Sequence, residues 1–90
     1  MQFRQILRKL GKTTQGKIKL REILDRYKHR LTEREIKVLR MTYLEKEFTD
    51  KICAEMHFCR TSYFGFLNTT LAKLEALLND TTIREIVQIA

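Results

Sequence analysis

No proline interrupts this 90-residue chain, and its only glycines stand at positions 11, 16 and 65. Proline and glycine are the residues that most often end or weaken a helix, because proline lacks an amide proton and glycine loses the most backbone entropy on folding. The abundant Leu, Ile, Lys, Arg and Glu residues favour a helical chain. We therefore predict an all-α fold, a small helical domain. A chain of this length is able to form a hydrophobic core.

Apolar side chains recur at helical spacing through the first third of the chain. The first stripe ends at Gly11, after which residues 11–16 are expected to form a connector. A second stripe with the same spacing predicts another amphipathic helix. The two apolar faces comprise Phe3, Ile6, Leu7 and Leu10, and then Leu20, Ile23, Leu24, Tyr27 and Leu31.

Positive charge gathers in the same segment. Residues 1–30 hold ten lysines and arginines against two acidic residues, a net charge of +8, whereas residues 31–90 hold eight against nine, a net charge of −1. Such a segment attracts polyanions: nucleic acid, an anionic membrane surface or an acidic protein face. We interpret residues 1–30 as a basic N-terminal helical extension packed on a domain formed by residues 31–90. Its candidate phosphate contacts are Arg4, Arg8, Lys9, Lys12, Lys17 and Lys19.

The sequence carries no signal for export or membrane insertion. It lacks an apolar run long enough to span a bilayer, and residues 1–10 alternate charged and apolar residues, unlike a signal peptide. A membrane-surface role for residues 1–30 is disfavoured, because these helices lack tryptophan and are needed to cover the core. We expect a cytoplasmic protein whose partners do not include a membrane.

A capping box marks the start of a third helix. The Thr32 hydroxyl is placed to accept from the Glu35 amide, and the Glu35 carboxylate to accept from the Thr32 amide. The helix is therefore predicted to begin at Glu33 and to end near Leu44. Its inward side chains are expected to be Ile36, Leu39 and Tyr43.

A short helix is predicted next, with Thr49 as its N-cap. Phe48 and Cys53 stand at the two positions of a hydrophobic staple, which fixes the angle at which the chain joins a helix. The helix is expected to end near Met56. His57 then lies in the turn, where histidine tolerates left-handed backbone geometry.

Two more helices are predicted to complete the chain. Cys59 takes the cap position of a long helix that runs to about Leu78, and a second capping box of Thr82 with Glu85 starts a terminal helix. The apolar face of the long helix comprises Tyr63, Phe66, Leu67, Thr70, Leu71, Leu74, Leu77 and Leu78, and that of the terminal helix comprises Ile83, Ile86, Val87 and Ile89.

The order of these helices, together with particular residues, resembles a known DNA-binding domain. The stretch LTEREIKVLRMTY at residues 31–43, the segment 48–74 and its LAKL run are similar to the tetrahelical helix-turn-helix domain of LuxR/GerE-type regulators and of sigma-70 region 4. Residues 85–90 resemble the last LuxR/GerE helix, which commonly supports dimerisation in that family. The resemblance implies a stand-alone regulator of transcription that binds double-stranded DNA, with a homodimer formed through the C-terminal helix.

The resemblance also assigns candidate contacts to DNA. It implies a recognition helix at about residues 60–78 that lies in the major groove. Arg60 is suited to guanine or phosphate, and Asn68 to adenine. Arg34 matches a position that holds the DNA backbone in the related families. The complete DNA-facing set is Arg34, Arg60, Thr61, Ser62, Phe64, Gly65 and Asn68.

Two of these positions admit other interpretations. Phe64 and Gly65 stand where the related families often carry Lys, Arg, Asn or Gln. Phe64 is able to touch a thymine methyl, and Gly65 permits close backbone approach. In a structural alternative to DNA contact, Phe64 belongs to the hydrophobic core and Asn68 faces solvent. The functional alternative is a protein–protein interaction module in which Phe64 and Phe66 form an apolar patch that binds RNA polymerase or another regulator.

Cys53, His57 and Cys59 raise the hypothesis of a metal site. No fourth ligand is evident and the spacing matches no common zinc module, so no metal is predicted, and Cys53 is interpreted as a small buried residue. Neither histidine belongs to a recognisable set of nucleophile and carboxylate, and no phosphate-binding glycine loop occurs. We expect neither an enzyme nor a cofactor.

Overall fold

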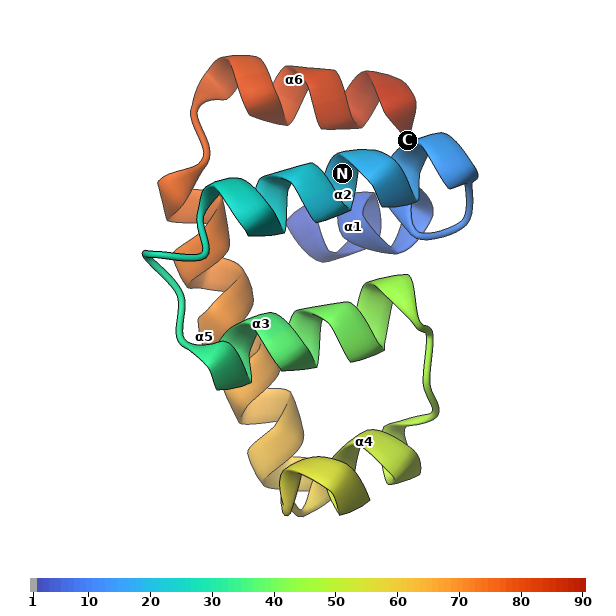
Figure 1. Cartoon of the computed structure of the whole chain (residues 1–90), viewed down its shortest axis with the longest axis vertical. Coiled ribbons are helices and arrows are strands. Elements are labelled where there is room, and N and C mark those ends of the chain that lie inside the picture. Colours follow the sequence, from blue (N-terminus) through green and yellow to red (C-terminus); the bar gives the residue numbers. More distant parts are fainter. Residues whose placement is uncertain (1) are drawn as a thin grey trace.

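The computed structural model describes residues 2–90 and confirms that the chain is all-α. Its elements are α1 (Phe3–Leu10), α2 (Thr14–Arg26), α3 (Glu33–Leu39), a π-helical turn η1 (Arg40–Leu44), α4 (Thr49–Met56), α5 (Arg60–Leu77) and α6 (Asp80–Ile89). No strand occurs in that part of the chain. In Figure 1, α1 and α2 lie between α6 and α3, and α5 runs past one end of them from α4 towards α6.

The first two helices approach each other closely at Gly16. Thr13 Oγ1 accepts a hydrogen bond from the Gly16 amide at 2.9 Å, so α2 begins at Thr14. The expected connector of residues 11–16 is therefore shorter than predicted. A Cβ atom on Gly16 would lie 2.1 Å from the Leu10 carbonyl oxygen. Only glycine allows the first turn of α2 to pass the end of α1 at this distance.

The link between α2 and α3 combines one unexpected and one predicted feature. α2 ends at Arg26, so Leu31 does not belong to this helix as predicted. Its side chain is nevertheless buried in the core. The capping box is confirmed: Thr32 Oγ1 accepts from the Glu35 amide at 3.1 Å, and Glu35 Oε1 accepts from the Thr32 amide at 2.8 Å. α3 therefore begins at Glu33, as predicted.

The end of this third helical segment departs from regular α geometry. The Glu45 amide donates to the Arg40 carbonyl oxygen, five residues earlier, at 2.8 Å. The segment still ends at Leu44, as predicted, but its last turn is a wider π-helical one. Tyr43 is buried in that turn. Single π-helical turns occur frequently at functional sites.

The predicted order of short helix, turn and long helix is confirmed for α4 and α5. α4 ends at Met56, and His57 adopts left-handed backbone angles of φ 59° and ψ 41°, as expected. Cys59 occupies the N-cap position of α5, and the helix runs to Leu77. The turn is held by a hydrogen bond of 2.9 Å from the Phe58 amide to a carbonyl oxygen of α4.

The beginning of α4 contradicts the predicted hydrophobic staple. Phe48, rather than Thr49, occupies the N-cap position, and no side chain caps the helix. Phe48 is 85% exposed while Cys53 is buried, so the two side chains do not pack together. In the preceding link, Lys46 adopts a left-handed φ of 52°.

The last helix begins earlier than the second capping box predicts. Asn79 is the cap: its Oδ1 accepts from the Thr82 amide at 2.8 Å, and α6 starts at Asp80. Thr82 is buried in the first turn. The Glu85 carboxylate does not cap the helix, because it lies 2.7 Å from Lys19 Nζ on α2.

One hydrophobic core joins all the helices. Val87 is an exception among the predicted inward residues, since it is 45% exposed. Within residues 2–90, no helix has both the length and the apolar character needed to cross a membrane. The fully or almost fully buried side chains include Leu7, Leu10, Leu20, Ile23, Val38, Leu39, Ile52, Leu74 and Ile86.

Candidate functional site

The turn between α4 and α5 is held by a side chain of α3. Arg34 Nη2 donates to the Met56 carbonyl oxygen at 3.2 Å, and the guanidinium carbon lies 4.9 Å from the centre of the Phe58 ring. Phe58 also packs against Phe66 of α5, with ring centres 5.2 Å apart. The sequence assigned Arg34 to the DNA backbone; in the structure its guanidinium group fixes this turn.

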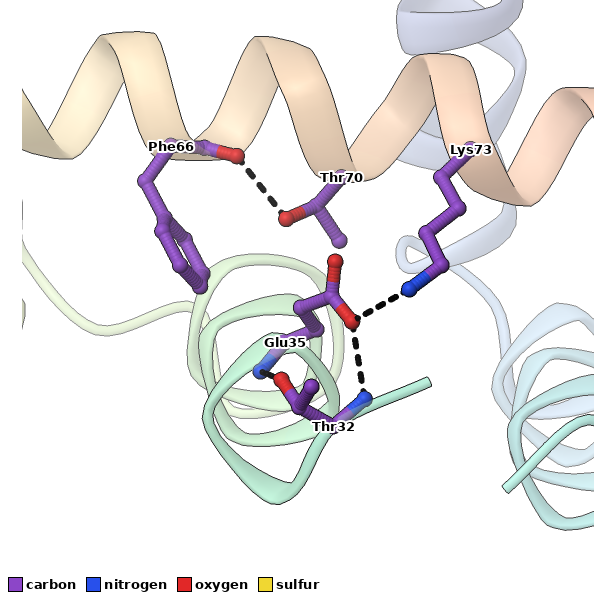
Figure 2. Close-up of polar contacts among 5 residues, drawn as sticks. All are labelled: Thr32, Glu35, Phe66, Thr70 and Lys73. Atoms are coloured by element: carbon purple, nitrogen blue, oxygen red, sulfur yellow. Dashed lines mark hydrogen bonds and ion pairs between the residues drawn. The ribbon is translucent and has the colours of Figure 1, made fainter. Parts of the chain in front are cut away.

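Figure 2 shows how α3 fixes the inner face of α5. Glu35 Oε1, which accepts from the Thr32 amide, also lies 3.1 Å from Lys73 Nζ. The buried Thr70 hydroxyl donates to the Phe66 carbonyl oxygen at 2.8 Å, one turn earlier in the same helix. Lys73 thereby joins the start of α3 to the last third of α5, and the buried side chains of Glu35 and Thr70 both have hydrogen-bond partners.

The electrostatics of this contact favour the ionised form of Glu35. Burial by itself raises the pKa of the carboxyl group, whose side chain is 11% exposed. The hydrogen bonds from Thr32 and Lys73 and the positive charge of Lys73 outweigh burial and lower the pKa below the ordinary value of 4.5. The carboxylate therefore stays charged at neutral pH and makes charge-assisted hydrogen bonds, which are the stronger kind.

The outer face of α5 presents small, uncharged side chains. Thr61, Gly65 and Asn68 are exposed, and their spacing of three or four residues places them on one side of the helix. A Cβ atom on Gly65 would meet no atom within 4 Å, so packing does not require glycine there. No hydrogen bond within residues 2–90 engages the side chain of Thr61 or Asn68. The fold makes no use of this face.

Phe64 lies at the edge of the outer face. Its side chain is 46% exposed and its ring centre lies 5.0 Å from that of Tyr63, so it is not the core residue of the structural alternative. Phe66 packs against Phe58 on the other side of α5. The predicted patch of Phe64 with Phe66 is therefore wrong. Among the described phenylalanines, Phe48 is the most exposed.

The first turn of α5 holds two further predicted residues. Arg60 Nε lies 3.4 Å from Asp50 Oδ1, and both side chains are largely exposed, so the pair is a weak one. Cys59 Sγ lies 3.2 Å from Ser62 Oγ, and hydrogen bonds to the sulfur from the Ser62 hydroxyl and from the backbone amides of Ser62 and Thr61 lower the pKa of the Cys59 thiol. Arg60 and Ser62 both remain exposed to solvent.

The structure separates the predicted phosphate contacts into three groups. Arg4 and Arg8, one turn apart on α1, line a groove that is also bordered by Phe64 of α5. Lys19 instead forms its ion pair with Glu85 of α6, and its side chain is only 16% exposed. The three remaining residues, Lys9, Lys12 and Lys17, do not line the groove.

Two residues of the groove escaped the sequence interpretation. Tyr43 was assigned to the core from its helical spacing, and Lys46 lay in a loop without periodicity. Both line the same groove as Arg4 and Arg8. The left-handed backbone of Lys46 has no sequence signal, because Gly, Asn and Asp are the residues that usually indicate it.

The two cysteines occupy different environments. Cys53 is buried in α4, as predicted, whereas Cys59 is exposed at the start of α5, and both are free thiols. Over residues 2–90, no three side chains of the His, Cys, Asp and Glu types are grouped so as to hold a metal ion.

Fold and site together define a small all-α protein with a basic groove beside an exposed helix face. Residues 3–75 match the protein family described as "Protein of unknown function (DUF1492)", and the chain belongs to that family. The matched region includes α1, the groove and most of α5. No curated protein and no solved structure matches the chain.

Proposed function

We propose that the protein is a DNA-binding regulator of transcription in which α4 and α5 form a helix-turn-helix and α5 enters the major groove. One observation carries this proposal: the outer face of α5 is exposed and makes no contact that the fold needs. The major groove, about 12 Å wide, admits an α-helix whose outward side chains then reach the base edges. The resemblance of residues 31–90 to LuxR/GerE-type and sigma-70 region 4 domains supports the same assignment.

Each outward residue has a contact suited to its chemistry. Asn68 is able to form two hydrogen bonds with adenine, and Arg60 binds guanine or a phosphate at the start of the helix. Thr61 and Ser62 donate to base edges or to phosphate oxygens. Gly65, on the same side of α5, leaves room for the helix backbone to approach the bases.

The position of the basic residues supports the proposal electrostatically. Most of the affinity of such proteins for DNA comes from neutralising phosphates. The two cations of α5, Arg60 and Lys73, both lie within ion-pair distance of carboxylates. Arg4 and Arg8 of α1 therefore provide the positive charge beside α5. This accounts for the concentration of charge in residues 1–30, outside the proposed helix-turn-helix.

A selection from a random pool of duplexes at about physiological salt, where non-specific binding is weak, tests the proposal. We expect an enriched motif, and a two-fold symmetric one if α6 mediates a homodimer. Asn68→Ala should relax preference at one position of that motif by about 1–3 kcal/mol, whereas Gln15→Ala, an exposed change on α2, should leave it intact. Absence of enrichment, together with absence of duplex binding, contradicts the proposal.

The exposure of Phe48 favours a second candidate function. An exposed aromatic side chain, here 85% exposed at the start of α4, is a typical anchor of a protein interface. We propose as the alternative that this surface binds RNA polymerase or another regulator. Binding to purified RNA polymerase that is insensitive to salt and lost in Phe48→Ser supports the alternative, since DNA binding weakens steeply with ionic strength.

A further inference from the structure

A groove of about 340 Å³ lies where α1, η1, the start of α4 and α5 meet. Three cations line it, Arg4 and Arg8 from α1 and Lys46 from the link before α4. Phe64 and Leu67 of α5 form an apolar side. The groove thus combines concentrated positive charge with an aromatic wall at the edge of the outer face of α5.

The three cations of this groove are not neutralised by ion pairs within the described part of the protein. In the described part of the chain, none of the three cations has an ion-pair partner. One carboxylate, Glu47, also lines the groove, but it lies 3.2 Å from Lys51 Nζ and is already paired. Like charges held close together repel each other, and a bound anion relieves that repulsion.

The hydroxyl group of Tyr43 is a second, independent observation. Tyr43 is 4% exposed and lines the groove, yet its hydroxyl forms no hydrogen bond within residues 2–90. Every fully buried polar side-chain atom of residues 2–90 has a hydrogen-bond partner, so the unpaired Tyr43 hydroxyl is not fully buried. Since Tyr43 lines the groove, we infer that its hydroxyl opens onto it. Burial raises the pKa of Tyr43 to about 12, although Arg4 and Arg8 act to lower it, so the group is a hydrogen-bond donor at neutral pH.

The groove is held in shape by close backbone packing. A Cβ atom on Gly11 would lie 2.3 Å from the Tyr43 carbonyl oxygen, so the end of α1 lies directly against η1. Arg4 also borders a shallower depression together with Asn68. The groove and one of the proposed base-reading residues therefore lie on the same flank of α5.

We propose that this groove binds a phosphate group, with the cations around the anion, the Tyr43 hydroxyl donating to one oxygen and Phe64 against the attached sugar. The inference rests on the proposed function, because the phosphate that we assign to it belongs to the DNA backbone beside the bases that α5 reads. Free nucleotides share this chemistry, and the experiment distinguishes the two sources. The inference adds Tyr43 and Lys46 to the interface.

Duplex affinity over a series of salt concentrations tests the groove directly. Tyr43→Phe removes only a hydroxyl that the fold does not use, and we expect it to weaken duplex binding about fivefold with no loss of stability. Arg8→Gln should weaken binding about tenfold and reduce the slope of log affinity against log salt by about 0.9. Arg40→Gln is the matched control, because Arg40 is an exposed cation outside the groove with no assigned phosphate contact, and it should change affinity less than about twofold.

A second arm follows the ring signals of Tyr43 by NMR as inorganic phosphate or a mononucleotide is added to the wild type and to Arg8→Gln. If the duplex binds but groove and control variants behave alike, the groove inference fails and the proposed function stands. If no duplex binds but phosphate or nucleotide shifts the Tyr43 signals only in the wild type, the groove is a site for free nucleotides and the proposed function fails. If neither ligand binds, both fail.

Discussion

The two faces of α5 differ in how fully the protein itself uses them. The inner face is engaged by buried leucines and by the Glu35–Lys73 ion pair, so each of its polar groups at the α3 contact has a partner. The outer face, with Thr61, Gly65 and Asn68, is exposed and contributes nothing to the core. An amphipathic helix needs only one apolar face to fold. The composition of the other face is therefore free to be set by a binding partner.

The largest predicted effect concerns a glycine that packing does require. Gly16→Ala places a Cβ atom 2.1 Å from the Leu10 carbonyl oxygen, and we expect the free energy of unfolding to fall by about 3 kcal/mol. Urea denaturation measures this change, with Gln15→Ala on the exposed side of α2 as a neutral control. A stabilising effect would show that α1 and α2 are not in contact at this point.

The next effect probes the polar contact on the inner face of α5. Glu35→Gln removes the charge that binds Lys73 and weakens the cap of α3, so we expect a loss of about 2 kcal/mol in the free energy of unfolding. Glu33→Gln, an exposed change in the same turn, is the control and should change stability by less than about 0.5 kcal/mol.

The same contact predicts a dependence of stability on pH. Because folding lowers the pKa of Glu35 below 4.5, its contribution is fully present above that value and is lost as the pH falls through the lower, folded-state pKa. Denaturation midpoints measured between neutral and acidic pH should therefore fall more steeply for the wild type than for Glu35→Gln. Parallel curves would exclude a charged Glu35 at this contact.

A smaller difference in stability is expected between variants that remove the hydroxyl of Tyr63 or of Tyr43. Tyr63→Phe breaks the 2.9 Å hydrogen bond with Thr42 Oγ1, and we expect a loss of about 1 kcal/mol in the free energy of unfolding. Tyr43→Phe should lose none, because that hydroxyl has no partner in the described chain. Chemical denaturation of both variants makes the comparison, and equal losses would reveal a hydrogen bond at Tyr43.

The smallest effect has the opposite sign and belongs to the outer face. Gly65→Ala introduces a methyl group into open space within a helix, so we expect the free energy of unfolding to rise by about 0.5–1 kcal/mol. Thermal denaturation of the variant beside Gly16→Ala measures the contrast between the two glycines. A loss of stability in Gly65→Ala would mean that the outer face takes part in the fold.

Local signals in the sequence were sufficient for much of the fold. The capping box of Thr32 with Glu35 gave the start of α3, and helical spacing gave the core positions of α1 and α5. The failures lie where distant segments meet. Position 16 lies inside a helix and is still a glycine, because the end of α1 packs directly against it. Glu85 binds Lys19 of α2 instead of capping its own helix.

The candidate site was predictable only in part, for the same physical reason. Helical spacing was enough to place Asn68 and Gly65 on an outward face of α5. The groove brings together side chains from α1, η1 and the link before α4, and no local pattern specifies that contact. Tyr43 shows the difficulty most clearly, since its ring is buried as predicted while its hydroxyl opens onto the groove.

The stability and the duplex affinity of Gly65→Glu, measured on the same preparation, test the use of the outer face of α5 most directly. Glutamate is a better helix former than glycine and has open space here, so we predict a gain of about 0.5 kcal/mol in the free energy of unfolding. If this face approaches DNA closely, the phosphates should repel the added negative charge and lower duplex affinity about tenfold or more. A variant that is more stable and binds the duplex as tightly as the wild type would contradict the proposal that this face reads DNA.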